Sequence, residues 1–390
     1  MFGKLPTAWL QLTYQKVKLA VAICGIAFIV VLVFIQLGFR ESLFDSSVRI
    51  HQALKADIFI IGARSPSLIA LSSFSRRRLY QALAFPQVES ISGVYTGLAK
   101  WRSPSERTLW RNIFVIGFNV NDNIINLPGL EENLDKLKKP DVVLFDRSSR
   151  REFGTIVQDF ENLGNISTQI RSSGPDDRRI QVQGLFNLGT SFGIDGTILT
   201  SDLNFRRIFS NRPEGFIDIG LVSLKPGANL QQTLMEMRQV LPKDVVILSR
   251  AEFVKQEKMY WQNSTNIGFI FTIGLLGALL VGVVIVYQIL YSNIVDSMAE
   301  YATLKAMGYR HTYLLGVVFQ EAFILALLGY LPGFFAALSV YNFSRKATGL
   351  PISMDIQRAL SVFTLTLVLS FVSGAITVQK LRQADPADIF

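Results

Sequence analysis

Few residues in this sequence have the types and spacing that catalysis or metal binding would need. The chain of 390 residues holds two histidines, His51 and His311, and one cysteine, Cys24. Metal sites built on histidine or cysteine need several such ligands close together, and a disulfide needs two cysteines. We therefore expect no metal site, no bound cofactor and no disulfide in this chain.

One stretch, GTSFG (189–193), fits the G-x-S-x-G pattern of hydrolases that use a serine nucleophile. That pattern requires a strand before it, a helix after it and a histidine later in the chain. Here IDGTILTS follows, which predicts a turn and a strand, and His51 lies upstream. We interpret the stretch as a glycine-rich turn. A membrane-bound enzyme that acts through Ser191 is the weaker alternative.

Phosphate-binding and nucleic-acid-binding patterns are also missing from the sequence. The loop G-x-x-x-x-G-K-S/T, whose backbone cradles nucleotide phosphates, occurs nowhere. The net charge of +9 is diffuse, and no basic helix carries interleaved aromatic residues. The run SRRRLY (75–80) is interpreted as a solvated helix face rather than an anion site. We expect that the chain is not an enzyme, does not hydrolyse nucleotide itself and binds no nucleic acid.

The stretch SMAEYATLKAMGYR (297–310) has the marks of a short, complete helix. Ser297 and Glu300 form the S-x-x-E capping box, and Gly308 can supply the left-handed residue that ends a helix. A helix of about ten residues is not stable alone in water, so it must dock. It packs either on its own membrane spans or on a partner protein. The strip that would make the contact holds Tyr301, Leu304 and Met307, with Lys305 beside it.

Long apolar stretches surround that helix. The chain is 49% hydrophobic, with a mean hydropathy of +0.32. Four stretches are each near or above the roughly 20 residues that cross a membrane as a helix. The first follows basic residues but lacks a small-x-small cleavage pattern, so it is predicted to stay as an anchor. The predicted transmembrane helices cover residues 19–38, 266–291, 313–340 and 360–378.

Polar and small residues stand out in the third predicted span. Glu321 is ionisable at membrane depth, which favours a role in gating or in a transport path. If the span starts late, near Val317, Glu321 lies close to the interface and has a structural role; both alternatives stay open. Gly329 and Gly333 predict close helix approach, and Pro332 between them predicts a kink.

Basic residues near the span ends indicate the orientation. Seven such residues flank one side and three the other, which favours the termini and the 292–312 loop inside. The cytoplasmic parts are then an interfacial helix in 1–18, the loop with helix 297–308, and a tail, 379–390. The segment 39–265 and the loop 341–359 are outside. The basic residues are Lys4, Lys16, Lys18, Lys305, Arg310, Lys380 and Arg382 inside, and Arg345, Lys346 and Arg358 outside.

The outside segment shows strand-like runs separated by helical patterns, which predicts a mixed α+β domain. Its two ends, 41–54 and 251–264, are predicted to be helical stalks that adjoin the first and second spans. Helices are expected at 72–84 and 229–241. Strands are expected at 56–63, 112–120, 141–146, 179–186, 215–224 and 244–249. The fold class is thus four transmembrane helices plus a large periplasmic α+β domain on helical stalks.

The region 300–333 resembles the FtsX-like permeases, the family that includes the MacB and LolC/LolE exporters. The family's pattern is an E-x-G/A-x-L-R/K-A-M/L-G segment followed by a span with a Glu-Ala pair and glycines. The C-terminal QKLRQADPADIF (379–390) resembles the family's closing segment. The arrangement of one span, an outside domain and three spans also matches. The matching residues are Glu300, Leu304, Lys305, Ala306, Met307, Gly308, Glu321, Ala322, Gly329, Gly333, Asp385, Pro386, Ala387 and Asp388.

The N-terminal PTAWLQLTYQKVKLAVAICGIAFIVVLVFIQLGF and the stretch VYTGLAKWRSP resemble the DevC-type permeases of cyanobacterial glycolipid exporters. That resemblance implies three partners: a separate ABC ATPase that binds ATP-Mg, a periplasmic membrane-fusion protein and a TolC-like outer-membrane channel. MacB carries a fused ATPase before its first span. Here only about eighteen residues precede the span, so we expect the ATPase to be a separate chain.

Together these features predict a permease subunit of a mechanotransmission-type ABC exporter in a bacterial, cyanobacterial inner membrane. Four spans leave little room for a conduit, so a homodimer in contact with membrane lipid is expected. The cargo would be a lipid or another amphiphile, pushed from the periplasm towards the outer membrane. The alternative is an FtsX-like transmembrane lever that regulates a periplasmic cell-wall hydrolase.

Overall fold

The computed structural model describes residues 6–104, 108–172, 177–191, 193–298, 307 and 311–383. The chain divides into two compact units, each of which is described by itself. The helical unit contains Met1–Ser42, Asn266–Thr348 and Ile352–Phe390, and the α+β unit contains Leu43–Thr265 and Gly349–Pro351.

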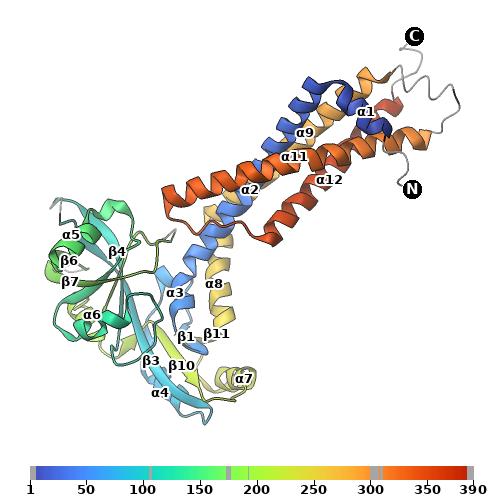
Figure 1. The fold of residues 1–390 in the computed structure, drawn as a ribbon. Helices are drawn as coiled ribbons and strands as arrows, with labels where there is room; N and C mark the ends of the chain where they lie inside the picture. Colours follow the sequence, from blue (N-terminus) through green and yellow to red (C-terminus); the bar gives the residue numbers. More distant parts are fainter. Residues whose placement is uncertain are drawn as a thin grey trace. The chain divides into compact units, whose positions relative to one another are not determined.

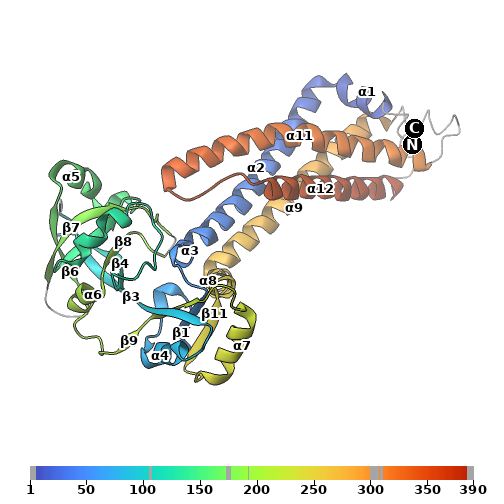
Figure 2. The ribbon, with the colours of Figure 1, turned by 60° about the horizontal axis from the view of Figure 1, so that its bottom comes forward.

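Long helices build the helical unit, and Figures 1 and 2 both show them running alongside one another. Among the described residues, four helices are long and apolar enough to cross a membrane, which confirms the predicted number of spans. Contacts join α9 to α12, α11 to α12 and α1 to α11. The bounds are α1 Pro6–Tyr14, α2 Lys16–Ser47, α9 Asn266–Asp296, α11 His311–Thr348 and α12 Ile356–Gln383.

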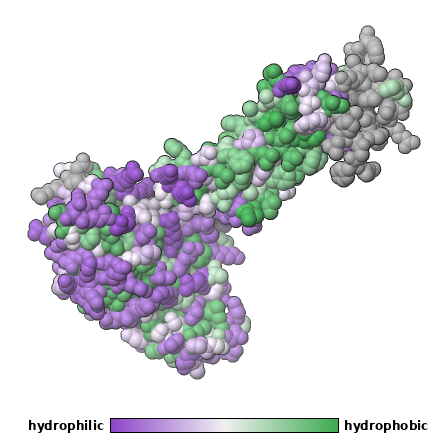
Figure 3. All heavy atoms as spheres, in the orientation of Figure 1, coloured by the Kyte–Doolittle hydropathy of each residue, from purple (hydrophilic) through white to green (hydrophobic). Residues whose placement is uncertain are grey.

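The surface of these four long helices is apolar. Figure 3 shows hydrophobic residues over most of the visible face of the helical unit, outside the grey atoms. The hydrogen bonds of a helix stay within the helix, so such a surface is compatible with hydrocarbon. Helix α9 exposes a long series of large apolar side chains: Phe269, Ile270, Ile273, Leu276, Leu280, Val281 and Val284.

Two helix ends differ from the expected segment boundaries. Helix α1 ends at Tyr14, and Lys16 already belongs to α2, so the interfacial helix ends before the expected boundary at residue 18. Helix α11 runs past the expected end at 340 to Thr348. It stops where Gly349 adopts a left-handed conformation, with φ +69°. No glycine or proline interrupts 334–348, so hydrophobicity alone misjudged this end.

The α+β unit contains a nine-stranded sheet with the order β11-β1-β10-β3-β4-β8-β5-β7-β6. The strands are β1 Ile58–Gly62, β3 Val88–Arg102, β4 Trp110–Phe118, β5 Val142–Asp146, β6 Ile166–Arg171, β7 Arg178–Phe186, β8 Thr197–Ser201, β10 Ile219–Leu224 and β11 Val245–Ser249; β2 Phe74–Ser75 pairs with β9 Phe216–Ile217. The helices are α3 Arg49–Ala53, α4 Arg77–Leu83, α5 Ile156–Leu163, α6 Asp202–Ile208, α7 Leu230–Val240 and α8 Arg250–Asn263, with short 3₁₀ helices at Leu68–Ala70, Glu131–Lys138 and Arg151–Phe153.

The long strand β3 gives the sheet its shape. Its first part pairs with β10, and its later part pairs with β4. Its end, at Lys100 and Trp101, also pairs with β6. The strands β3, β4, β8, β5, β7 and β6 therefore close into a ring, while β10, β1 and β11 extend from β3. Closure removes two sheet edges that would otherwise be open to other chains.

Two apolar clusters form the core of this unit. One contains Trp101, which is fully buried, and Phe205. The other contains Phe114 and Phe253. Strands β3 and β4 contribute to both clusters because their successive side chains point to opposite faces. Trp101 therefore packs in the core of this unit.

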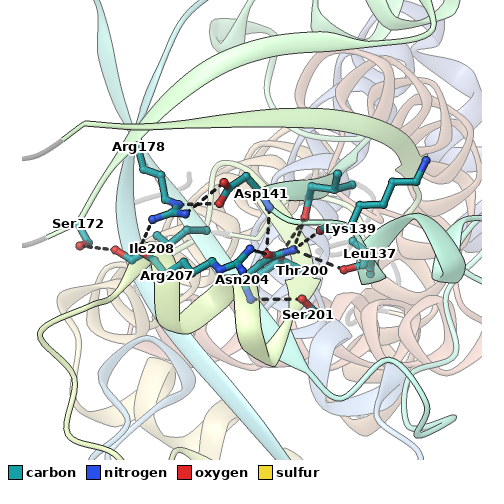
Figure 4. A network of polar contacts seen from close by, with 11 residues as sticks. Leu137, Lys139, Asp141, Ser172, Arg178, Thr200, Ser201, Asn204, Arg207 and Ile208 are labelled. Carbon is teal, nitrogen blue, oxygen red and sulfur yellow. Dashed lines mark hydrogen bonds and ion pairs between the residues drawn. The ribbon is translucent and has the colours of Figure 1, made fainter.

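A polar network around Asn204 fixes α6 against the start of β5 (Figure 4). The Asn204 amide nitrogen donates to the carbonyl oxygen of Lys139 at 2.9 Å, and its oxygen accepts from the backbone N–H of Asp141 at 3.0 Å. Asp141 has φ 60° and forms a two-point ion pair with Arg178. The buried Asn204 amide thus provides hydrogen-bond partners for two backbone groups of this turn, the carbonyl of Lys139 and the N–H of Asp141.

Candidate functional site

Most of the predicted contact helix lies outside the described residues. This applies to Glu300, Tyr301, Leu304, Lys305 and Gly308. Of the residues predicted for this helix, the structure describes Ser297 and Met307. The backbone N–H of Ser297 donates to the carbonyl oxygen of Asn293, so Ser297 closes the last turn of α9. Met307 is exposed. The docking role of this segment stays a prediction.

The beginning of α2 and the end of α9 meet next to that segment. The Lys18 ammonium forms an ion pair with the Asp296 carboxylate. The two side chains are 47% and 36% exposed. An ion pair this exposed contributes little to stability. It joins the start of α2 to the end of α9. Sequence reasoning missed this pair because the two residues are far apart in the chain.

Glu321 lies near that ion pair, on α11. Its residue surface is 2% exposed, so the position is buried within the helical unit. Together with Lys18 and Asp296 it lines a cavity of about 250 Å³. The predicted intramembrane carboxyl group therefore faces a cavity at one end of the helices. Neither the gating nor the structural alternative is tested by this placement.

The two glycines predicted to allow close approach lie against α2. A Cβ atom at Gly329 would come within 2.5 Å of Ile26, and one at Gly333 within 2.7 Å of Val30. These distances are too short for any side chain, so the close packing expected from the small-xxx-small pair is present. Helix α11 continues through Pro332 as one helix.

Helix α9 packs between α2 and α12. A Cβ atom at Gly282 would lie 3.0 Å from Ile29 on α2 and 3.3 Å from Leu369 on α12. The Ser373 hydroxyl donates to the carbonyl oxygen of Val283 at 3.0 Å. Small residues and hydroxyl hydrogen bonds of this kind are how helices associate in lipid. At Gly277, in contrast, a Cβ atom would meet none of the described atoms within 4 Å.

A second polar cluster joins α2, α11 and α12 at their other end. Two nitrogens of Arg358 contact Glu41 Oε2, at 3.1 Å and 2.5 Å. A third nitrogen donates to the carbonyl oxygen of Ser353 at 2.6 Å. The guanidinium also lies over the Tyr341 ring, 5.7 Å from its centre. The Arg358 side chain is only 8% exposed, whereas that of Glu41 is 54% exposed. A buried guanidinium therefore links three spans through a half-exposed carboxylate.

Tyr341 extends that link to the body of α2. Its hydroxyl donates to the carbonyl oxygen of Phe34. Its ring covers Gly38 so closely that a Cβ atom there would overlap the hydroxyl oxygen. A glycine at this position is therefore required by the tyrosine. Sequence reasoning counted Arg358 only as a charge that indicates orientation.

In the α+β unit, both expected stalk segments are helical. Helix α8 starts with a complete capping box, in which Ser249 and Glu252 bond to each other's backbone N–H groups. Its residue Glu257 is buried, accepts a hydrogen bond from the Trp261 indole at 2.7 Å, and lies 3.6 Å from His51 Nε2. His51, on α3, is fully buried, and its ring lies 4.2 Å from that of Phe253.

The GTSFG stretch is placed by a buried aspartate and an arginine. The carboxylate of Asp146 accepts from the backbone N–H groups of Leu188 and Gly189, both at 3.0 Å. Burial raises the pKa of Asp146 above its ordinary value, while these N–H groups and the charge of Arg49 oppose that shift. For Arg49, a base, burial has the opposite effect and lowers the pKa below its ordinary value. The Arg49 guanidinium donates to the carbonyl oxygen of Leu188 at 3.3 Å.

In the described part of the chain, a strand rather than a helix comes directly after that stretch. The backbone N–H of Ser191 donates to the carbonyl oxygen of Ile194, and strand β8 begins at Thr197. The strand-to-helix turn that a serine nucleophile requires is not formed by these residues. The interpretation as a glycine-rich turn is confirmed.

The chain is similar to known proteins over part of its length. No curated protein sequence matches the chain. Solved structures of other proteins are similar to part of it, and the following two are among them. The periplasmic region of MacB from Actinobacillus actinomycetemcomitans shares 12% identity, with a TM-score of 0.34, over 55% of this chain and 97% of that one. The extracellular domain of the noncanonic ABC-type transporter YknZ from Gram-positive bacteria shares 11% identity, with a TM-score of 0.33, over 50% of this chain and 99% of that one.

The C-terminal part of the chain gives the clearer match. Residues 258–386 match the family described as FtsX-like permease C-terminal. The matched range contains helices α9, α11 and α12, and so three of the four candidate spans found among the described residues. This multi-pass membrane protein therefore carries an FtsX-like permease domain in its C-terminal third.

Proposed function

We propose that the chain is the permease subunit of an ABC exporter that works by mechanotransmission. The observation that carries this proposal is the FtsX-like permease match across residues 258–386. The chain also places a large α+β unit between its first span and that domain. In this proposal a separate ATPase supplies ATP binding and hydrolysis, since the sequence has no phosphate-binding loop.

The ATPase would act on the segment 297–308, between α9 and α11. Closure of two ATPase subunits would move that segment, and the long helices would pass the movement to the α+β unit. Polar links such as Arg358–Glu41, and the close packing of α2 on Gly329 and Gly333, support this part of the proposal. They join the helices into a unit that can move as a whole.

Two copies of the chain, one for each ATPase, would form the complete transporter. The α+β unit would face the periplasm of a bacterium and contact a membrane-fusion protein, which leads to an outer-membrane channel of the TolC type. The cargo would be a lipid or another amphiphile, and a glycolipid is the specific candidate from the resemblance to DevC-type permeases. No residue of the chain is assigned a catalytic role.

Affinity purification of the chain from its native membranes tests this proposal. We expect an ABC ATPase and a periplasmic membrane-fusion protein to be recovered with it. The matched control is a chain in which helices α9, α11 and α12 are replaced by unrelated spans. Recovery of a cell-wall hydrolase or its activator, without a fusion protein, would instead indicate a transmembrane lever. Recovery of no ATPase would contradict the proposal.

A further inference from the structure

The cavity beside Glu321 has a composition that points to a ligand. Residues of α1, the start of α2, the end of α9 and α11 line it, and its volume is about 250 Å³. A water molecule occupies about 30 Å³ in the liquid, so the cavity is large enough for a small polar group but not for a whole lipid. All of its lining residues belong to the helical unit.

Charges in this cavity are arranged from the outside inwards. Lys18 and Asp296 are partly exposed, whereas Glu321 is 2% exposed. Two carboxylates against one ammonium leave a formal charge of −1, which disfavours a purely anionic ligand. The polar lining also includes a hydroxyl, that of Ser297, and carboxamides that can accept and donate hydrogen bonds: Gln11, Gln15 and Asn293.

Apolar residues also line this cavity: α1 contributes Leu10, Leu12 and Tyr14, and α2 contributes Leu19. Helix α1 also exposes Trp9. A short helix with exposed apolar and aromatic residues, joined to the end of a membrane span, suits the boundary between headgroups and acyl chains. The cavity therefore opens at the depth where lipid headgroups lie.

We propose that this cavity binds a phospholipid headgroup that ends in a primary ammonium. The ammonium would point to Glu321 and the carboxamides, and the phosphate would contact Lys18 near the opening. The acyl chains would run along Leu10 and Tyr14. A primary ammonium has N–H donors for these acceptors, and charge-assisted hydrogen bonds are the stronger kind.

Two other headgroup classes fit less well. A quaternary ammonium cannot donate hydrogen bonds, and proteins recognise it with a cage of aromatic rings. Among the described lining residues the one aromatic side chain is Tyr14, which is 87% exposed. An anionic headgroup would meet the formal charge of −1. The bound lipid would join α1 to α9 and α11, and this role does not depend on the identity of the cargo.

Native mass spectrometry of the full-length, delipidated chain tests the proposal. The probe is an equimolar mixture of phosphatidylethanolamine, phosphatidylcholine and phosphatidylglycerol with identical acyl chains. One charge-assisted hydrogen bond corresponds to a preference of about tenfold, so we expect phosphatidylethanolamine to be bound at least about tenfold better. Glu321→Gln should reduce that preference, and Asp355→Asn, which removes an exposed carboxylate outside the cavity, should leave it unchanged.

Several results would overturn the proposal. These are equal binding of the three lipids by the native chain, a preference for a sugar-headgroup lipid added in a fourth arm, or an unchanged preference in Glu321→Gln. Competition by free phosphoethanolamine at concentrations equal to those of the lipid would show that the ligand is a soluble amine rather than a lipid. If Glu321→Gln does not fold, the proposal is tested by the binding of the three lipids to the native chain, and equal binding overturns it.

Discussion

Gly333 of α11 lies directly against Val30 of α2. A Cβ atom at Gly333 would be 2.7 Å from Val30 and 2.9 Å from the carbonyl oxygen of Ala27. The second contact is with backbone, which cannot rotate away as a side chain can. The interface between the first and third spans therefore depends on the absence of a side chain at this position.

Gly333→Ala should separate α11 from α2. We expect a loss of about 1–3 kcal/mol in the unfolding free energy of the helical unit, which is the usual cost of overpacking. Gly277→Ala is the matched control, because a Cβ atom there would meet none of the described atoms within 4 Å. Both substitutions replace glycine by alanine, which has the higher helix propensity. The difference in stability between the two variants therefore reports the steric clash at position 333. Thermal unfolding in detergent measures it, and equal midpoints for the two variants would contradict the close contact.

Arg358→Ala should loosen the link between α12, α11 and α2. The change removes hydrogen bonds from the buried guanidinium to Glu41 and Ser353. A bond to a charged group is worth about 1.5–3 kcal/mol. The bond to Glu41 is worth less, because its carboxylate is 54% exposed and screened by solvent. We expect a clear drop in the thermal midpoint, partly restored by Arg358→Lys. Arg345→Ala is the control, since Arg345 is exposed and bonds only to the nearby Asn342 among the described contacts. Similar midpoints for the two alanine variants would argue against a buried link.

Asn204→Ala should destabilise the α+β unit. It leaves the backbone N–H of Asp141 and the carbonyl of Lys139 without their shown partner, at a cost of about 1–3 kcal/mol. The exposed Asn165 offers a control, Asn165→Ala. Urea unfolding followed by tryptophan fluorescence gives the two free energies. No difference between the variants would show that the network of Figure 4 does not stabilise this turn.

Glu252 makes the stability of the α8 start depend on pH. Burial by itself would raise the pKa of Glu252. Hydrogen bonds from the Ser249 backbone N–H and hydroxyl and from the Arg238 guanidinium outweigh that effect, so the pKa of Glu252 lies below its ordinary value of 4.5. Because the folded pKa is the lower one, the stabilisation is complete above about 4.5 and is lost as the pH falls through the folded pKa.

Glu252→Gln should therefore weaken the α+β unit at neutral pH and flatten its loss of stability below pH 4.5. Unfolding midpoints measured from pH 3 to pH 7 would show this. Glu214→Gln, at an exposed position, is the control and should keep the slope of the native chain. If the midpoint of Glu252→Gln fell with pH as steeply as that of the native chain, the pKa of Glu252 would be the same in the folded and unfolded states.

Local patterns were enough to predict many of the elements. Strand-like runs predicted β1, β5 and β11, and the helical pattern over 229–241 predicted α7. These elements bury continuous or regularly spaced apolar residues, which is what such patterns detect. The four candidate spans among the described residues follow from length and hydrophobicity in the same way.

The long strand β3 was missed. Its sequence, VESISGVYTGLAKWR, mixes polar residues and glycines because it serves two parts of the sheet. Gly93 packs against Ile217, and Gly97 lies under Phe209, so tertiary contacts explain both glycines. The closure of the ring by β3 and β6 is also not local. No short window of sequence contains that information.

The polar links of the helical unit could not be predicted from short stretches of sequence either. Lys18 and Asp296, or Glu41 and Arg358, meet only once the helices pack. The close approach at Gly329 and Gly333 could be predicted, because spacing alone places both glycines on one helix face. What the segment 297–308 contacts stays a prediction.

The central claim is that ATP-driven movement enters the chain at the segment 297–308. The most direct measurement is the ATPase rate and cargo export of proteoliposomes that contain the partner ATPase and either the native chain or Leu304→Glu or Met307→Glu. Leu163→Glu, at an exposed leucine of α5, is the matched control. The account predicts that both segment variants insert normally but lose coupling between ATP hydrolysis and export, while the control keeps it. Normal coupled export by Leu304→Glu and Met307→Glu would contradict it.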